Sequence, residues 1–181
     1  MRLLTLAAAA LLALAGLAAW VVESEPEFYL RARYPLEYEH IIRGHARTYD
    51  LDPALLAAVI YTESRFDPSA RSSAGAVGLM QLLPDTAKGI ALRTGGNRFV
   101  VADLLDPEIN VRYGSWYLDH LRDRYGDTRL ALAAYHAGQG NVDAWLRSGG
   151  GIRFPETRAY LDAVTSVRRV YAKAYRSELG L

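Results

Sequence analysis

The sequence predicts an all-α domain preceded by an N-terminal hydrophobic helix, and three observations support this prediction. Signals that start and stop helices recur through residues 35–179. No stretch in that range shows the sustained alternation of apolar and polar residues that is typical of a half-buried strand. Hydrophobic residues make up 51% of the 181-residue chain, which supplies enough apolar surface for the core of one domain.

The N-terminal segment, residues 1–22, is expected to be a signal peptide or a membrane anchor. Residues 3–22 form an uncharged run of twenty residues, with only Arg2 before it and the acidic sequence ESEPE after it. A helix buried in a soluble core would usually show a polar face, which this run lacks. A run of this length can span a bilayer.

Both alternatives for this segment predict an exported protein of the cell envelope, periplasmic or on the outer face of the cytoplasmic membrane. Small residues at Gly16, Ala18 and Ala19 offer a cleavage site for a signal peptide. Trp20 suits a membrane interface and favours an uncleaved anchor. Residues 23–34 are expected to form a juxtamembrane linker.

The first helices after the linker begin at prolines. A segment opened by Pro35 is expected to end near Asp50. Asp52 is a favourable N-cap and Pro53 suits the first helical position, so a helix is expected through ALLAAVIYTES. Pro84 opens a further short helix.

The next two helices repeat these signals. Asp106 and Pro107 again place a cap before a proline, and the helix that follows is expected to stop at Gly126. Asp127 caps the next helix, which is expected to stop at Gly138, because glycine is the usual residue just past a helix end.

Two more helices complete the domain. A short helix over residues 141–146 is closed by the glycines at 149–151, and the last helix begins after Pro155 and runs to Leu179. Residues 35–179 are therefore expected to hold about seven helices in one compact unit.

Composition excludes several classes of function. The chain has no cysteine, which excludes disulfide scaffolds, thiol nucleophiles and zinc sites built on cysteine. The four histidines show no metal-binding spacing, so neither a metal nor a cofactor is expected. Lys and Arg number 21 against 20 Asp and Glu, and without Arg2 the two counts are equal. A neutral domain lacks the basic surface that nucleic-acid binding requires.

Glu63 is placed unusually for a structural glutamate. It follows Leu56, Val59 and Ile60 at spacings of seven, four and three, so it belongs to their apolar face. Most helical glutamates are solvated, but this one lies near a helix C-terminus, where the helix dipole disfavours a carboxylate. No Lys or Arg stands three or four residues away. Burial without a partner would raise its pKa, as a general acid for glycosidic cleavage requires.

No second carboxylate stands out beside Glu63. Asp67 belongs to a turn, and Asp85, Asp103 and Asp106 stand at helix starts, where an acid has an ordinary capping role. Most glycosidases use two carboxylates, so a mechanism with one carboxylate is indicated here.

Residues 72–81 form a small, glycine-rich segment that ends in Met80 and Gln81. It is either a plain loop between helices or a place where a ligand approaches the backbone closely. In the second interpretation Gln81 would hydrogen-bond a neutral polar ligand, and Met80 would offer an apolar face to a sugar ring.

Five blocks of sequence stand in order through residues 35–175. The blocks are Glu63-Ser64 with Phe66-x-Pro68; Ser73-Ala74-Gly75-Ala76-x-Gly78-Leu79-Met80-Gln81-Leu82-x-Pro84-x-Thr86-Ala87; Asp106-Pro107-x-x-Asn110 with Gly114-x-x-Tyr117-Leu118; Ala133-Ala134-Tyr135-x-Ala137-Gly138; and Glu156-Thr157-Arg158-x-Tyr160. Together they resemble the catalytic domain of soluble lytic transglycosylases, a family that cuts bacterial peptidoglycan. The resemblance implies a lysozyme-like fold of the goose type for residues 35–179.

The resemblance also implies a reaction. Glu63 matches the family's single acid/base, which protonates the oxygen between N-acetylmuramic acid and N-acetylglucosamine. The C6 hydroxyl of the muramic residue then attacks C1 of its own ring, which leaves a 1,6-anhydromuramic end. The partners implied are peptidoglycan glycan strands, and the domain is expected to act as a monomer.

The same resemblance assigns glycan-binding roles to seven further residues. These are Ser64, Met80, Gln81, Asn110, Tyr135, Glu156 and Tyr160. Without the resemblance, both tyrosines could be core aromatics and Asn110 could be a local cap. Gly114 is expected to allow close packing. His136 departs from the family, which usually has Asn there, and this predicts an altered acid side of the pH profile.

A hydrolytic muramidase and a non-catalytic peptidoglycan-binding module remain as alternatives. The first needs a second acid or a base, which the sequence does not place. The second would be marked by loss of the acid, and Glu63 stands within an intact motif.

Overall fold

The computed structural model describes the backbone of residues 2–181 and the side chains of residues 11–16 and 19–181. In this part of the chain every regular element is a helix, and the extended contacts are isolated bridges from Val77 to Arg71 and to Leu82. The prediction of an all-α fold is therefore confirmed. The chain divides into two units, Met1–Pro35 and Leu36–Leu181.

The first unit contains α1 (Arg2–Ser24) and α2 (Glu27–Arg33). Pro26 separates the two helices in an extended conformation, with φ −63° and ψ 152°. Helix α2 thus occupies much of the segment for which the sequence predicts a linker. Among the described residues, no helix is both long and apolar enough to cross a membrane. Much of the predicted signal or anchor lies outside the described side chains, so it stays a prediction.

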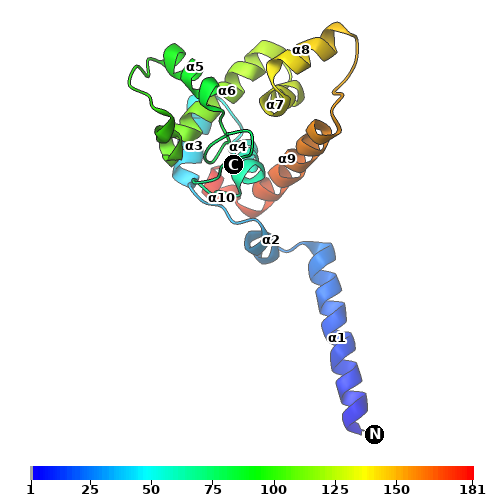
Figure 1. Ribbon diagram of the computed structural model, residues 1–181. Helices are drawn as coiled ribbons and strands as arrows, with labels where there is room; N and C mark the ends of the chain where they lie inside the picture. Colours follow the sequence, from blue (N-terminus) through cyan, green and yellow to red (C-terminus); the bar gives the residue numbers. More distant parts are fainter. Residues whose placement is uncertain (1) are drawn as a thin grey trace. The chain divides into compact units, whose positions relative to one another are not determined.

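The second unit is built from nine described helical elements. They are α3 (Glu39–Thr48), α4 (Pro53–Ser64), α5 (Pro84–Thr94), the 3-10 helix η1 (Val101–Leu105), α6 (Pro107–Tyr125), α7 (Thr128–Ala137), α8 (Gln139–Arg147), α9 (Pro155–Ala174) and α10 (Arg176–Leu179) (Figure 1). The expected last helix is in fact two, because the chain leaves helical geometry at Tyr175, with φ −133°.

The three expected aspartate caps mark the starts of α4, α6 and α7. The side chain of Asp52 accepts a hydrogen bond from the Ala54 amide at 2.8 Å, and Asp106 accepts one from Ile109 at 3.0 Å. Asp127 accepts one from the amide of Leu130 at 2.7 Å. Each acid satisfies an amide that has no partner within its helix, which fixes where the helix begins.

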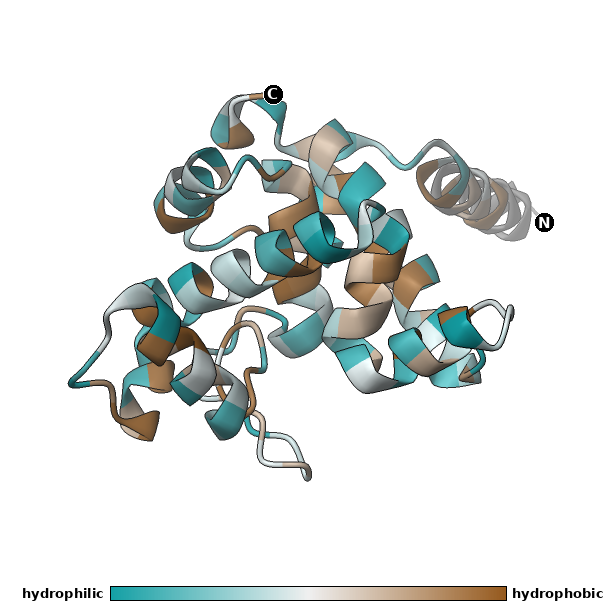
Figure 2. Cartoon of the chain, turned by 90° about the horizontal axis from the view of Figure 1, so that it is seen from above, coloured by the Kyte–Doolittle hydropathy of each residue, from teal (hydrophilic) through white to brown (hydrophobic). Residues whose placement is uncertain are grey.

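Helix α4 forms the centre of the second unit. Its residues from Ala54 to Tyr61 are all buried, as expected of a helix that is apolar on every side. It packs chiefly against α9 and also against α3, while α6 contacts α7 and α3. Figure 2 shows the hydrophobic parts of the ribbon gathered on the inner helices. The last turn of α4, residues 62–64, is partly exposed.

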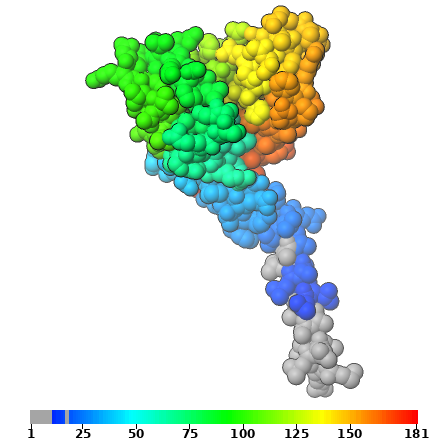
Figure 3. Space-filling model, in the orientation of Figure 1, coloured from blue at the N-terminus to red at the C-terminus, as the bar shows by residue number. Residues whose placement is uncertain are grey.

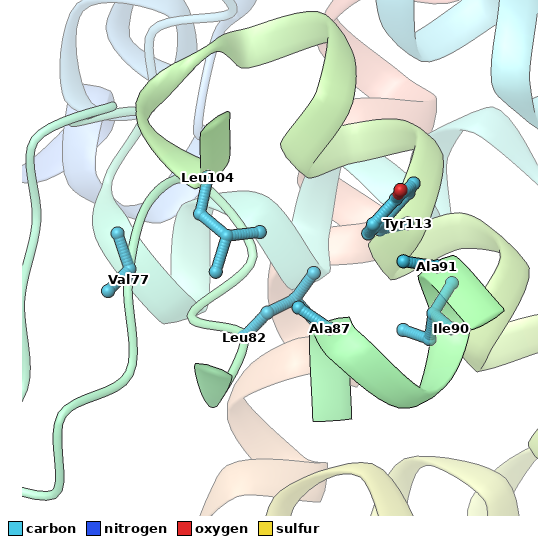
Figure 4. Packing of buried hydrophobic residues seen from close by; sticks show 7 residues of the cluster. All are labelled: Val77, Leu82, Ala87, Ile90, Ala91, Leu104 and Tyr113. Carbon is cyan, nitrogen blue, oxygen red and sulfur yellow. The ribbon is translucent and has the colours of Figure 1, made fainter. Parts of the chain in front are cut away.

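A separate hydrophobic cluster fastens the loop between α4 and α5 to α6. Its members come from the loop, α5, η1 and α6, and Figure 4 labels all seven: Val77, Leu82, Ala87, Ile90, Ala91, Leu104 and Tyr113. The cluster anchors both ends of the turn at residues 78–81, which is the part of the loop that bears on the site.

Candidate active site

Glu63 lies in the last turn of α4, on the side of the helix that the sequence predicts. Burial raises the pKa of its carboxyl from 4.5 to about 7, and interaction with the Tyr160 hydroxyl partly opposes this rise. No other carboxylate contributes to the shift. A carboxyl that keeps its proton near neutral pH is able to donate it to a leaving oxygen.

Two tyrosines from two other helices lie next to Glu63. Burial raises the pKa of both hydroxyls, Tyr135 on α7 and Tyr160 on α9, well above 10, and the charge of Glu63 adds to each rise. The Tyr135 hydroxyl donates to the Met80 carbonyl at 2.7 Å. The buried Tyr160 hydroxyl has no hydrogen bond of good geometry in the described structure. The Tyr135 hydroxyl therefore holds the loop, whereas the Tyr160 hydroxyl is available to interact with the Glu63 carboxyl.

Ser64, next to the acid, ties α4 to the same loop. Its hydroxyl donates to the Leu79 carbonyl at 2.8 Å and lies 3.1 Å from the Ile60 carbonyl. The side chain is half-buried. Its proton is thus used within the protein, and its lone pairs remain available to accept a hydrogen bond from a ligand.

Asn110 of α6 holds the loop in place, and Met80 of the loop packs against Gly114 of α6. Asn110 accepts from the Met80 amide at 2.7 Å and donates to the carbonyls of Val77 and Leu104, both at 2.9 Å. The Met80 side chain rests on Gly114, where an added Cβ would lie 2.2 Å from its sulfur. Both Asn110 and Met80 are 0% exposed, so neither side chain presents a surface to a ligand here.

Asn110 satisfies three backbone groups and Met80 fills the space above a glycine, so both hold the loop in its conformation. The glycan-binding roles predicted for these two residues stay predictions. The expectation that Gly114 permits close packing is met, with Met80 as its neighbour.

Gln81 sits at the tip of the loop in a left-handed conformation, with φ 47°. Its amide nitrogen donates to the carbonyls of Gly78 at 2.9 Å and Ala70 at 3.1 Å. These bonds fix the orientation of the half-buried side chain and leave its amide oxygen as an acceptor. The binding role predicted for Gln81 stays a prediction.

His136 of α7 packs against Tyr160 of α9. The imidazole stacks on the Tyr160 ring, with centroids 4.5 Å apart, and Nδ1 lies 3.2 Å from the hydroxyl oxygen of buried Thr157. Burial lowers the pKa of His136, while the exposed Glu156 opposes this fall. The sequence does not show that His136, where the resembled family usually has Asn, contacts the tyrosine that interacts with Glu63. The contact between α7 and α9 in the folded chain shows it.

The aspartates considered as second acids have structural partners. Asp67 accepts from the amide and hydroxyl of Ser69 at 2.8 and 2.7 Å, which lowers its pKa. Asp103 accepts from the Val100 amide at 2.9 Å, and Asp106 caps α6. The described residues contain no cluster of His, Cys, Asp or Glu able to hold a metal ion. The site therefore offers one protonated carboxyl among hydroxyl and amide groups.

Comparison with known proteins gives consistent results. The family model described as transglycosylase SLT domain matches residues 40–153. The soluble lytic murein transglycosylase of Salmonella typhimurium is 32% identical over an alignment of 169 positions, and the match covers 84% of this chain and 25% of that protein. A transglycosylase of Enterobacteria phage PRD1 is 40% identical over 118 residues, which are 64% of this chain and 41% of that one.

Two solved structures resemble this fold closely. An inactive glutamate-to-glutamine mutant of lytic transglycosylase Slt from Pseudomonas aeruginosa superposes with a TM-score of 0.73 at 31% identity, covering 84% of this chain and 26% of that one. A 70-kDa soluble lytic transglycosylase in complex with bulgecin A gives a TM-score of 0.74 at 31% identity, covering 80% of this chain and 25% of that one. The chain spans about a quarter of the length of these larger relatives.

Proposed function

The chain belongs to the transglycosylase SLT domain family, and on this premise we propose that it is a peptidoglycan lytic transglycosylase. It would cleave the β-1,4 bond between N-acetylmuramic acid and N-acetylglucosamine and leave 1,6-anhydromuramic acid ends. Its relatives with solved structures carry the name lytic transglycosylase, which supports this reaction class.

Glu63 would perform both proton transfers. Its carboxyl gives a proton to the bridging oxygen as the bond between that oxygen and muramic C1 breaks. The muramic C6 hydroxyl then forms a bond to C1, and its proton passes to the Glu63 carboxylate. The acid is restored, no water is consumed, and the substrate supplies the nucleophile that a second carboxylate supplies in other glycosidases.

The observation that carries this proposal is the burial of Glu63 without a second carboxylate beside it. Its pKa is raised to about 7 by burial, and no second carboxylate acts on it. A hydrolytic muramidase would need such a group to activate water, as retaining and inverting glycosidases do.

The remaining residues would divide into two groups. The first group, which would face the glycan, is Ser64, Gln81, Glu156 and Tyr160. Ser64 and Gln81 keep an acceptor, Glu156 is exposed, and the Tyr160 hydroxyl interacts with Glu63. The second group would position the loop and consists of Tyr135, Met80 and Asn110. Tyr135 and Asn110 hydrogen-bond to the loop backbone, and the Met80 side chain packs on Gly114.

The organisation that we propose follows from the same family. Residues 35–179 would form the catalytic domain, residues 23–34 a juxtamembrane segment, and residues 1–22 a signal peptide or anchor. The relatives include a membrane-bound lytic murein transglycosylase F of Pseudomonas fluorescens, which is 33% identical over 122 residues, 64% of this chain and 23% of that protein. An exported, monomeric enzyme of the cell envelope that contacts glycan strands fits this assignment.

Digestion of purified peptidoglycan, analysed by mass spectrometry, tests the proposal. The wild-type chain should release muropeptides one water lighter than hydrolysis products, and Glu63→Gln should release none. Products with reducing muramic ends would instead establish a hydrolase. Folded wild-type protein that binds the strand without releasing product would establish a binding module.

A further inference from the structure

A cavity of about 380 Å³ lies at the N-terminal end of α4, between α4, α6, α7 and α9. Its volume falls within the range of about 300–1,000 Å³ that is typical of small-molecule sites. Helices α7 and α9 contact each other, and Figure 3 shows their yellow and orange segments next to each other on the surface of the second unit.

This cavity is separate from the candidate active site. Leu55, which lines it, stands eight residues before Glu63 on α4, a rise of about 12 Å along the helix axis. None of the candidate site residues lines the cavity. A ligand of the cavity would therefore not occupy the place of the glycan strand.

The floor of the cavity is apolar. It is formed by leucine and alanine side chains that are each at most 9% exposed: Leu51, Leu55, Leu118, Ala131, Leu132 and Leu161. Among the described residues, the lining includes no aromatic residue and no asparagine, glutamine or serine. A sugar ring would call for an aromatic face, and a peptide would call for partners for its amides. The floor instead fits an aliphatic chain, whose burial is favourable in proportion to the apolar area removed from water.

The rim of the cavity is charged, and most of its charge is already paired. Asp52 accepts a hydrogen bond from the Arg168 guanidinium. Arg122 donates to Asp119 at 2.8 Å, and the exposed carboxylate of Asp50 lies 4.0 Å from the same guanidinium. Both of these arginines therefore have acidic partners within the protein.

Arg129, in the first turn of α7, differs from the other two arginines of the rim. It is exposed, and no carboxylate in the part of the chain that the structure describes pairs with it. The nearest acid in sequence, Asp127, caps α7 through the Leu130 amide at 2.7 Å. Thr128 also lines the cavity and is exposed, so its hydroxyl is available beside the Arg129 guanidinium. Together the two side chains offer donors to both oxygens of one carboxylate.

We propose that this cavity binds a fatty acid, with the aliphatic chain on the leucine floor and the carboxylate on Arg129 and Thr128. One unpaired guanidinium at the edge of an apolar floor matches a ligand with one carboxylate and an apolar body. The end of a peptide with an apolar last residue shares this chemistry, but the lining offers its amides no side-chain amide or serine as a partner. The inference goes beyond the proposed function and does not depend on it.

Titration of the full chain, followed by nuclear magnetic resonance, tests this site with octanoate, 1-octanol and butanoate. Octanoate should bind and shift the amide resonances of Arg129 and Leu132. 1-Octanol keeps the chain length without the charge, and butanoate keeps the charge on a shorter chain, so each should bind at least about tenfold more weakly. Arg129→Gln should weaken the binding of octanoate by about tenfold and leave that of 1-octanol unchanged. The matched control is Arg98→Gln, which replaces an exposed arginine outside the cavity and should change neither affinity.

Equal affinities of wild type and Arg129→Gln for octanoate would overturn the proposal, as would octanoate that does not bind or that binds elsewhere. Acetyl-leucine, a carboxylate beside one apolar side chain, represents the end of a peptide, and tighter binding of it than of octanoate would overturn the fatty acid as ligand. Because Arg129 is exposed, its replacement leaves the core intact, and thermal melting checks this. Digestion of peptidoglycan reports on Glu63 and not on this cavity, so each of the two proposals can fail without the other.

Discussion

Replacing Glu63 with Gln should stabilise the fold, and the gain should grow with pH. In the folded chain burial raises the pKa of this carboxyl from 4.5 to about 7. Between these values the folded state keeps a proton that the unfolded state releases, so wild-type stability falls as pH rises and stays reduced above pH 7. The two pKa values differ by about 2.5, and each full step in pKa corresponds to about 1.4 kcal/mol, so the loss of stability is at most roughly 3 to 4 kcal/mol.

Urea unfolding followed by tryptophan fluorescence at pH 4.5, 7 and 8.5 measures this difference. The stabilities of wild type and Glu63→Gln should be similar at pH 4.5 and separate most at pH 8.5. Glu63→Ala provides the control, because it also removes the ionisation but leaves a cavity, so its offset from Glu63→Gln should not depend on pH. A constant difference between wild type and Glu63→Gln across the range would refute the claim that burial holds the proton.

Three further outcomes are expected. Activity should decline as pH rises through about 7, because Glu63 then loses its proton. The Tyr160 hydroxyl lowers the pKa of Glu63, so Tyr160→Phe should raise that pKa and move the decline to higher pH. The pH dependence of kcat checks this, and an unchanged profile would count against it. Asn110→Ala leaves three buried backbone groups unsatisfied and should lower the unfolding free energy by about 3 kcal/mol or more, measured in urea, whereas a loss under about 1 kcal/mol would contradict its positioning role. His136 stacks on Tyr160, and burial lowers the pKa of its imidazole. The pH profile of activity of His136→Asn should therefore match wild type above pH 7 and differ from it on the acid side. Identical profiles on the acid side would show that His136 does not affect the site.

Local rules were sufficient to predict most of the fold and the buried position of Glu63. The cap at Asp52 with Pro53 behind it sets the start of α4 from sequence alone, because a cap depends on neighbours a few residues away. Helical spacing then places Glu63 on the buried face of that helix. The same logic correctly assigned Asp106 to capping.

Residues whose partners are distant in sequence could not be assigned this way. A motif shows that a position is constrained, but not whether a ligand or the protein imposes the constraint. Asn110 contacts Met80 and Val77 across 30 and 33 residues, and only the folded chain shows that these contacts use its whole amide. The stack of His136 on Tyr160 likewise depends on how α7 and α9 meet.

The turn that follows Glu63 shows how the core supports the site. Arg65 and Phe66 both have left-handed backbones, with φ 52° and 66°, which is unfavourable for bulky residues by roughly 1–2 kcal/mol each. Phe66 is nevertheless 2% exposed, and its ring lies edge-on to Tyr171 of α9 with centroids 6.2 Å apart. Full burial of such a side chain contributes about 2–3 kcal/mol, enough to offset much of the strain. Aromatic packing between α4 and α9 therefore ends α4 directly after the acid, and α9 also supplies Tyr160 to that acid.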